Sequence, residues 1–420
     1  MLRLLRLILG SMCTAALLAC GGGDTPLPDL PPAQSGLPPA EGLSGWRRAA
    51  VDAVVDGRVW MGARSGFVVL VARDGQLIHA HTTGLRDLEA GLPMAMDTRF
   101  QIASMTKPII ATAAMILVEE GRIGLDDPVS DHLPEMAGME VAVLDEAGEV
   151  IETVPQISPM TVRNILSFAS GIGPGFESGP LTDRWRAEGP YTGEGSLAER
   201  VLRIPPLPLF EQPGTRWRYG SAYDVLARIV EVGAGEPLEV FLERRIFEPL
   251  GMRATHYLKD TPDDAPLAKM YTRSEDGLVL ATQRHRPDDW TPGGTGLVST
   301  APDYMRFALM LWNEGEYDGV RILSRESLQR MRQPEISGVL GTMGMEGLSF
   351  GLGVSVVTDQ EETPMATRDG DFWWSGAYGT HFWVSPSTGI VLVVLQQQEM
   401  NPEGDAPIAP FVVQQFALTD

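Results

Sequence analysis

The stretch Gln101-Ile-Ala-Ser104-Met-Thr-Lys107-Pro-Ile-Ile opens an apolar run that continues to Val118. Apolar residues fall almost all round this run, so it predicts a buried helix rather than an amphipathic surface helix. Pro108 lies in or near the expected first turn, where a missing backbone N–H is tolerated. Ser104 and Lys107 are three residues apart, which places them one turn apart on the same face of that helix.

This pairing suits nucleophilic catalysis. A serine hydroxyl is a poor nucleophile until a base takes its proton, and a neutral lysine amine can be that base because burial disfavours the charged form. The chain uses lysine at only three positions, Lys107, Lys259 and Lys269, and arginine supplies all its other basic residues. Lys107 is therefore expected to do something that arginine cannot, such as release a proton. The alternative is that Ser-x-x-Lys matches by chance, as short motifs do in long chains.

The N-terminus predicts a targeting segment. Arg3 and Arg6 precede a short apolar stretch at 7–18, which is too short to cross a bilayer comfortably. The following Leu-Leu-Ala-Cys20 resembles the lipobox of bacterial lipoproteins, where the chain is cut before the cysteine and the thiol is lipidated. We therefore expect a signal peptide at 1–19, lipidation of Cys20, and an exported bacterial lipoprotein on the periplasmic or cell-surface side of the membrane. An ordinary secretory signal, cleaved nearby, is the alternative.

Composition also bears on the segment that follows the signal peptide and on the cysteines. Residues 20–44 are rich in glycine and proline and lack apolar periodicity, so we expect a flexible, lipid-anchored tether before a folded part at 45–420. The only other cysteine, Cys13, lies in the signal segment, so a chain starting at Cys20 has neither an internal disulfide nor a cysteine metal site.

The net charge of −22 argues against nucleic acid or an anionic membrane surface as a partner.

Strand patterns occur at both ends of the folded part. Residues 67–73 and 77–81 flank Asp74-Gly75, a strong hairpin signal, and a short helix is expected before them at 46–56. Further strands are expected near the C-terminus, at 350–357, 380–385 and 389–396.

Two histidines on the second strand, His79 and His81, alternate with apolar residues. We expect them at exposed strand positions. A metal pair is the alternative, but no third ligand is evident in the sequence.

Helical periodicity dominates the middle of the chain, over 161–171, 221–232, 238–247, 304–313 and 325–331. The acidic segment 137–156 predicts a surface excursion, and 172–215, rich in glycine and proline, predicts long loops that line a site. Strands, then helices, then strands favour an α+β fold. We expect a sheet domain from about 45–100 and 300–420, with a mostly helical insertion at about 101–299.

Two further motifs follow the Ser-x-x-Lys motif. They are Tyr219-Gly-Ser221 and Trp374-Ser375-Gly376-Ala377. With these motifs in order over residues 45–415, the chain resembles the serine β-lactamase and penicillin-binding-protein superfamily. The resemblance is to its class C-like branch, which includes family VIII-type carboxylesterases and D-aminopeptidases. It implies a β-lactamase/transpeptidase-like fold, an antiparallel sheet flanked by helices, with no metal and no organic cofactor.

The resemblance also implies roles for individual residues. Ser104 would be the acylated nucleophile, Lys107 would activate it, and Tyr219 would pass protons to and from it. The backbone N–H groups of Ser104 and Ala377 would form the oxyanion hole. The remaining motif residues would contact the substrate, namely Ser221, Trp374, Ser375 and Gly376.

Two departures from the superfamily pattern bear on the substrate. Ser221 stands where β-lactamases and peptidases have asparagine. Trp374 stands where they have a lysine or histidine, a cation that helps to hold a substrate carboxylate. Family esterases often carry Trp-x-Gly at this place. We therefore expect a serine hydrolase that acts on short-chain carboxylic esters through an acyl-enzyme on Ser104.

Two alternatives stay open at this point. One is a D-amino acid peptidase or amidase, or a class C-like β-lactamase, acting on cell-wall peptides. The other is a non-catalytic penicillin-binding-like protein, against which the intact Ser104, Lys107 and Tyr219 argue. In each case the expected partner is a small-molecule ester or peptide, with no nucleic acid and with membrane contact through the lipid anchor only.

Overall fold

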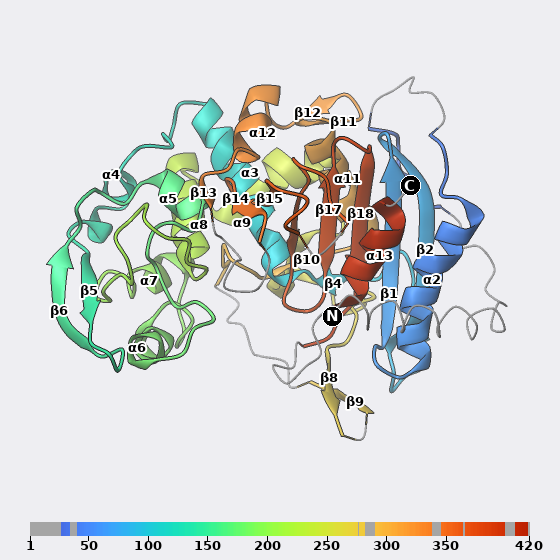
Figure 1. Ribbon diagram of the computed structural model, residues 1–420, viewed down its shortest axis with the longest axis horizontal. Helices are drawn as coiled ribbons and strands as arrows, with labels where there is room; N and C mark the ends of the chain where they lie inside the picture. The colour runs from blue at the N-terminus through green and yellow to red at the C-terminus, as the bar shows by residue number, and fades with distance from the viewer. Residues whose placement is uncertain are drawn as a thin grey trace.

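The computed structural model describes residues 27–33, 40–275, 277–281, 290–337, 346–363, 366–399 and 408–418 (Figure 1). The expected signal peptide and Cys20 lie outside the described residues, as does part of the expected tether, so these stay predictions. Across the part of the chain that is described, no helix is both long and apolar enough to cross a membrane.

A nine-stranded antiparallel sheet forms the centre of the fold, in the order β13-β14-β15-β16-β17-β18-β1-β2-β3. Both ends of the chain contribute to it, because β1 (Gly66–Arg73) pairs with β18 (Ile390–Leu395). Both strands are buried along almost their whole length and rich in valine, which suits strands covered on two faces. The other strands are β2 (Gln76–Asp87), β3 (Leu92–Pro93), β13 (Ile336–Ser337), β14 (Leu348–Phe350), β15 (Ser355–Val357), β16 (Phe372–Ser375) and β17 (His381–Ser385).

The turn between β1 and β2 confirms the hairpin expected from the sequence. Asp74 and Gly75 have φ of 49° and 77°, the positive values that a two-residue turn between twisted strands requires. The helix expected before the hairpin is also present, as α2 (Gly45–Trp60), and it packs on β1 and β2.

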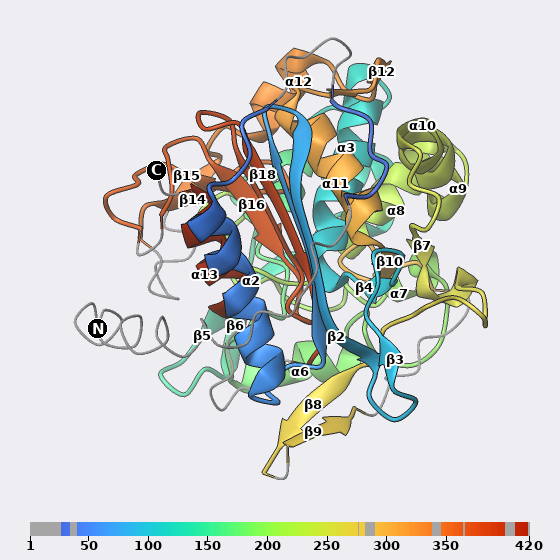
Figure 2. The ribbon, with the colours of Figure 1, turned by 90° about the vertical axis from the view of Figure 1, so that its right-hand side faces the viewer.

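Helices cover both faces of the sheet (Figure 2). On one face α2 lies against α13 (Ile408–Leu418), and on the other α11 (Ala301–Trp312) packs on β1, β17 and β18. The side chain of Thr300 caps α11 by accepting the N–H of Asp303 at 3.2 Å. These layers confirm the α+β class and the antiparallel sheet flanked by helices.

The expected buried helix is α3 (Thr106–Glu119), in which every residue from Thr106 to Leu117 is buried. It packs against α8 (Ala222–Ala234), which ends at Gly235 in the left-handed conformation that favours glycine. Shorter helices complete this part of the chain: α4 (Val129–His132), α5 (Val162–Leu166), α6 (Pro180–Glu188), α7 (Leu197–Val201), α9 (Leu238–Leu242), α10 (Glu248–Leu250) and α12 (Arg325–Met331). The remaining strands form small sheets. One contains β4 (Phe100–Gln101), β7 (His256–Tyr257) and β10 (Leu297–Ser299). Another pairs β8 (Tyr271–Ser274) with β9 (Gly277–Leu280), and a third pairs β11 (Glu316–Tyr317) with β12 (Val320–Arg321).

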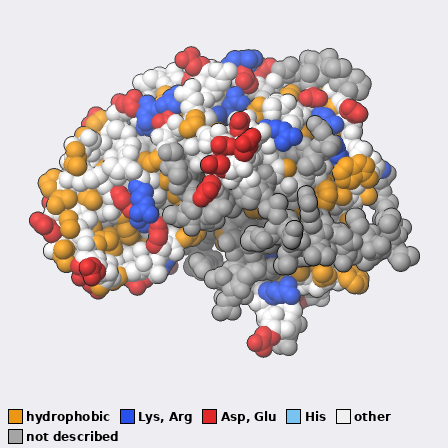
Figure 3. Space-filling view, in the orientation of Figure 1, with side chains coloured by type: hydrophobic (Ala, Val, Ile, Leu, Met, Phe, Trp, Pro, Cys, Tyr) orange, Lys and Arg blue, Asp and Glu red, His pale blue; other side chains and the backbone are white. Residues whose placement is uncertain are grey.

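The acidic segment at 137–156 is a hairpin of β5 (Glu140–Leu144) and β6 (Val150–Pro155). Ile151 on β6 and Ile157 just beyond it are 65% and 84% exposed, and apolar side chains gather on this part of the surface (Figure 3). The segment is thus a surface excursion, as expected, but an ordered one.

Four local expectations need correction. The strand expected at 350–357 is two strands, because β14 ends at Phe350 and β15 begins at Ser355. Residues 172–215 are not only loops, because they contain α6 and α7. The helix expected at 161–171 ends at Leu166 as α5. The Trp374 motif lies on β16, a strand that the sequence pattern did not predict. The boundaries between a sheet domain and a helical insertion stay a prediction.

The expectation that His79 and His81 are exposed is wrong. His79 is 6% exposed and its Nε2 lies 2.8 Å from Asp52 Oδ1, and His81 Nε2 lies 2.8 Å from Asp56 Oδ1. Burial lowers the pKa of His81, but the hydrogen bond to Asp56 and the two carboxylate charges outweigh it and raise that pKa. Both pairs tie α2 to β2. Among the described residues, no group of three or more His, Cys, Asp or Glu side chains is placed so that it could hold a metal ion.

His381 on β17 makes stability depend on pH. It is 1% exposed, its Nδ1 lies 2.8 Å from Ser375 Oγ, and burial lowers its pKa to about 3, against about 6.5 in an unfolded chain. Between these values the unfolded chain binds a proton that the folded protein rejects, so stability is lost as pH falls. Between pH 7 and pH 5 we expect the free energy of unfolding of the wild type to fall by about 2 kcal/mol more than that of His381→Gln.

Urea titrations of both proteins at several pH values, followed by tryptophan fluorescence, check this expectation. Asp371 acts in the opposite direction, because burial raises its pKa to about 6 and its protonation stabilises the fold as pH falls. Asp371 is present in both proteins, so its effect cancels in the difference. If the free energy of unfolding changed equally with pH in the two proteins, His381 would not be the cause of the loss.

Candidate active site

Ser104 lies on a tight turn between β4 and α3. The turn is a single 3-10 turn at Ala103–Met105, and it runs directly into the helix. Ala103 is buried and has φ of 46°, a left-handed conformation that an alanine rarely adopts. No sequence pattern indicated this strained residue, which sets the direction of the serine that follows it.

Contacts from other elements hold the strained turn on both sides. The N–H of Ile102 donates to the Leu297 carbonyl on β10 at 3.0 Å. On the other side the Tyr304 hydroxyl of α11 donates to the Met105 carbonyl at 2.9 Å. The surrounding structure therefore overdetermines the position of Ser104, which is how strain persists at a functional site.

The structure brings together the three residues expected to carry the chemistry. Lys107 Nζ lies 3.1 Å from Ser104 Oγ, and the Tyr219 hydroxyl oxygen lies 2.7 Å from the same atom. Lys107 is 3% exposed, and its Nζ lies 4.6 Å from the centre of the Tyr219 ring. A hydroxyl contacted by an amine and a phenol has two partners through which its proton can leave and return.

Lys107 has a further partner that the motifs did not reveal. Its Nζ donates to the Gly294 carbonyl at 2.7 Å. A side chain at Gly294 would place its Cβ 3.3 Å from the same Nζ, closer than ordinary contact. The repeated glycine at 293 and 294 was a sequence signal for a close backbone approach, but it does not say to what.

A second tyrosine, Tyr223, is near Lys107 but is not placed to carry protons. It is fully buried, and its hydroxyl donates to the Leu166 carbonyl at 2.9 Å. Burial, with a smaller contribution from Tyr219, raises the pKa of Tyr223 well above its usual range. Tyr223 therefore stays a neutral phenol, and Tyr219 is the tyrosine that contacts Ser104.

Aromatic rings surround Tyr219. Phe168 and Trp374 pack against it with ring centres 4.7 Å and 5.8 Å away. Phe176 stacks on it at 5.2 Å with only 6° between the ring planes, and this phenyl side chain is 70% exposed. The outside of the site therefore presents a flat apolar surface one ring away from Ser104. The sequence indicated only that 172–215 lines a site, and not which residue does so.

The Trp374 motif lies next to the Ser104 turn. Trp374 is 7% exposed and forms part of the aromatic wall beside Tyr219. At Gly376 a Cβ would lie 2.3 Å from the Ile102 carbonyl oxygen, so only glycine allows β16 to approach the turn this closely.

The other residues of this motif are placed differently from one another. The Ser375 hydroxyl is hydrogen-bonded to Nδ1 of His381 on the neighbouring strand β17, at 2.8 Å. Ala377 is exposed, and its backbone N–H makes no hydrogen bond to a described residue. A donor of this kind suits an oxyanion hole, and that role for the N–H groups of Ala377 and Ser104 stays a prediction.

The position of Ser221 gives no support to its expected contact with a substrate. The residue is fully buried, and its hydroxyl donates to the Gly173 carbonyl. Its backbone N–H donates to the same oxygen at 3.3 Å. A hydroxyl committed in this way holds the segment that leads to Phe176 against the start of α8.

One other serine has the spacing of a nucleophile elbow, in Gly347-Leu-Ser349-Phe-Gly351. Ser349 is 3% exposed on strand β14, not on a strand-to-helix turn. Its hydroxyl is 3.4 Å from that of Thr358. Ser349 therefore has the spacing of a nucleophile elbow without its strand-to-helix turn.

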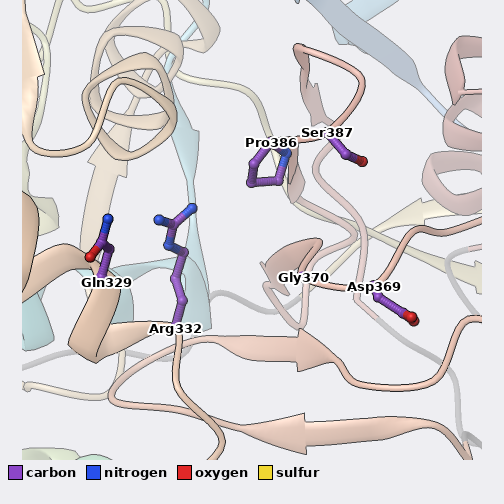
Figure 4. Close-up of a pocket in the computed structure, with 6 residues that line it drawn as sticks. All are labelled: Gln329, Arg332, Asp369, Gly370, Pro386 and Ser387. Carbon is purple, nitrogen blue, oxygen red and sulfur yellow. The ribbon is translucent and has the colours of Figure 1, made fainter.

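An open depression of about 480 Å³ lies elsewhere, between α12 and two turns of the sheet (Figure 4). Its lining residues are Gln329, Arg332, Asp369, Gly370, Pro386 and Ser387. Gly370 precedes β16, whereas the motif at Ser375 ends that strand, so the depression is separate from the site around Ser104.

Comparison with known proteins agrees with the fold. The family model described as Beta-lactamase matches residues 51–415. The chain is 37% identical to Protein Rv1367c of Mycobacterium tuberculosis over 367 residues, which is 83% of this chain and 89% of that protein. It is 29% identical to Esterase EstB of Burkholderia gladioli over 371 residues, with the same shares of the two chains.

Among solved structures, the chain is similar to EstCE1, described as a hydrolase with promiscuous acyltransferase activity. That match has a TM-score of 0.76 and 27% identity, and it covers 89% of this chain and 99% of the other. It shows the β-lactamase/transpeptidase-like fold that the sequence motifs implied. Because the family match spans nearly the whole folded part, the chain belongs to the β-lactamase family, in its class C-like branch.

Proposed function

We propose that the protein is a serine hydrolase that cleaves carboxylic esters through an acyl-enzyme on Ser104. The observation that carries the proposal is the double contact on one oxygen, with Lys107 Nζ at 3.1 Å and the Tyr219 hydroxyl at 2.7 Å from Ser104 Oγ. A structural serine needs one hydrogen-bond partner, whereas a nucleophile needs a base and a route for its proton.

In acylation the Ser104 hydroxyl gives its proton to neutral Lys107 as Oγ bonds to the ester carbonyl carbon. Backbone N–H groups at Ser104 and Ala377 would stabilise the oxyanion. When the carbonyl reforms, its bond to the alcohol oxygen breaks. The proton passes from Lys107 through the Tyr219 hydroxyl to that oxygen, which leaves as an alcohol.

Deacylation repeats these steps with water. Water gives a proton to the Lys107–Tyr219 pair and bonds to the acyl carbon, after which Ser104 leaves and takes the proton back. The product is a carboxylic acid. An alcohol in place of water would give a new ester, which would be an acyl transfer. EstCE1 is described as having promiscuous acyltransferase activity.

The charges around the site favour esters over substrates that carry a carboxylate. Trp374 occupies the place where a cation would hold that carboxylate. The nearby Arg218 is 7% exposed and is already paired with Glu211 and with Glu177, the latter at 3.0 Å. A missing charge-assisted hydrogen bond costs about 1.5–3 kcal/mol, or roughly ten- to a hundredfold in binding. The exposed ring of Phe176 adds an apolar surface that suits a neutral substrate.

The test is kcat/KM for p-nitrophenyl butyrate, nitrocefin and a D-alanyl-D-alanine peptide with one preparation of the protein. We expect the ester to react at least about tenfold faster than either of the others, because it needs no cation at position 374. Hydrolysis of nitrocefin or the peptide at a rate equal to or above that of the ester would instead favour a β-lactamase or peptidase.

A further inference from the structure

Asp224, the third residue of α8, is a fully buried carboxylate beside the site. Its Oδ1 accepts the N–H of Gly293 at 3.0 Å. Burial raises the pKa of this carboxyl, while hydrogen bonds from Tyr191 and from the same N–H partly oppose the rise. Burying a carboxylate is costly, so its retention at this place calls for a function.

The backbone held by Asp224 carries the acceptor for Lys107. The carbonyl of the next residue, Gly294, receives the hydrogen bond from Lys107 Nζ at 2.7 Å. Gly293 itself packs so closely on α8 that a Cβ there would lie 1.9 Å from the Tyr223 carbonyl oxygen. The carboxylate thus pins the chain one residue before the carbonyl that contacts the lysine.

That carbonyl controls the direction of the lysine. A neutral amine has two N–H donors and one lone pair, and only the lone pair can accept the serine proton. With one N–H held by Gly294, the lone pair of Lys107 can face Ser104 Oγ, 3.1 Å away. Without a fixed acceptor the amine would stay buried but lose this orientation, and proton transfer depends strongly on such alignment.

We propose that Asp224 is a positioning residue, which orients Lys107 by fixing the Gly293–Gly294 backbone. It contacts neither the substrate nor the reacting oxygen. The inference rests on the proposed role of Lys107 as the base for Ser104. It predicts that losing Asp224 slows the reaction of Ser104 without weakening the binding of substrate.

Two variants test the proposal. Asp224→Ala removes the acceptor, whereas Asp224→Asn keeps the side-chain size and one oxygen that can accept the Gly293 N–H. The matched controls are Asp303→Ala and Asp303→Asn. Asp303 is also the third residue of a helix, is 7% exposed, and accepts a loop N–H, that of Ala254 at 2.7 Å. The charges that act on it are those of Arg306 and Arg99.

The main readout is the rate constant for phosphonylation of Ser104 by a fluorophosphonate, located by mass spectrometry. It needs no natural substrate. The second readout is the separate kcat and KM for p-nitrophenyl butyrate, with the melting temperature as the measure of folding. We expect phosphonylation and kcat to fall about a hundredfold in Asp224→Ala and about tenfold in Asp224→Asn, with KM within about threefold of wild type.

The outcomes separate the inference from the proposed function. Phosphonylation of both Asp224 variants at the wild-type rate would overturn the positioning role, as would equal losses in the Asp303 variants. If Asp224→Ala fails to fold, Asp224→Asn decides the matter, and a loss below about threefold counts against the proposal. A wild-type protein that is not labelled at Ser104 would remove the proposed function and this inference with it.

Discussion

Replacing Ser104 with alanine is expected to abolish ester hydrolysis while leaving the fold intact. In the proposed mechanism this side chain supplies the oxygen that forms the acyl-enzyme, and without it Lys107 and Tyr219 have no hydroxyl to activate. Removing a nucleophile from a unit that acts together lowers kcat by about 10⁴-fold or more. The change is small and the residue is partly exposed, so the free energy of unfolding is expected to change by less than about 1 kcal/mol. Steady-state kinetics and urea denaturation of the same preparation measure both quantities.

Ser349→Ala is the matched control, because Ser349 is the serine with the spacing of a nucleophile elbow. Its buried hydroxyl lies 3.4 Å from that of Thr358, and no described contact joins it to Ser104, so this variant is expected to keep wild-type kinetics. A folded Ser104→Ala protein with more than a small fraction of wild-type kcat would show that another group attacks the ester.

Lys107→Arg is expected to inactivate the protein almost as fully as Lys107→Ala does. Arginine carries a positive charge, but it does not release a proton near neutral pH and so cannot act as a base at this buried position. Loss of a general base lowers kcat by about 10²–10⁴-fold, so the two variants are expected to lie within about tenfold of each other. Kinetics with p-nitrophenyl butyrate compare them directly.

Lys269→Arg is the control for this substitution. Lys269 is 39% exposed and pairs with Asp87 at 3.0 Å on the surface, where arginine can take its place. Its arginine variant is expected to match wild type. An active Lys107→Arg protein would show instead that position 107 contributes only charge, and the base would have to be Tyr219 or water.

The parts of the fold that the sequence predicted are those in which local pattern and tertiary structure agree. Asp74-Gly75 predicts its turn because both residues tolerate positive φ, and the turn does not depend on distant contacts. The run after Lys107 is apolar on all sides, which leaves only a buried helix as its place. Strand β16 was missed because its aromatic residues have no period-two alternation: it is buried on both faces.

The features of the site that were missed depend on contacts between segments far apart in the chain. Ala103 adopts a strained φ because β10 and α11 hold its neighbours. Alanine as a residue type does not indicate such a conformation. His79 is buried because a helix that precedes it by some twenty-seven residues brings Asp52 to its ring. The Gly294 carbonyl is backbone, so no residue type marks it as a partner of Lys107.

The central claim is that Ser104 becomes acylated. Its most direct test is intact-mass and peptide mass spectrometry of the protein quenched in acid during turnover of p-nitrophenyl butyrate. The account predicts a gain equal to one butyryl group, located on the peptide that contains Ser104 and absent from Ser104→Ala. A butyryl group on another residue, or one that persists in Ser104→Ala, would contradict the account.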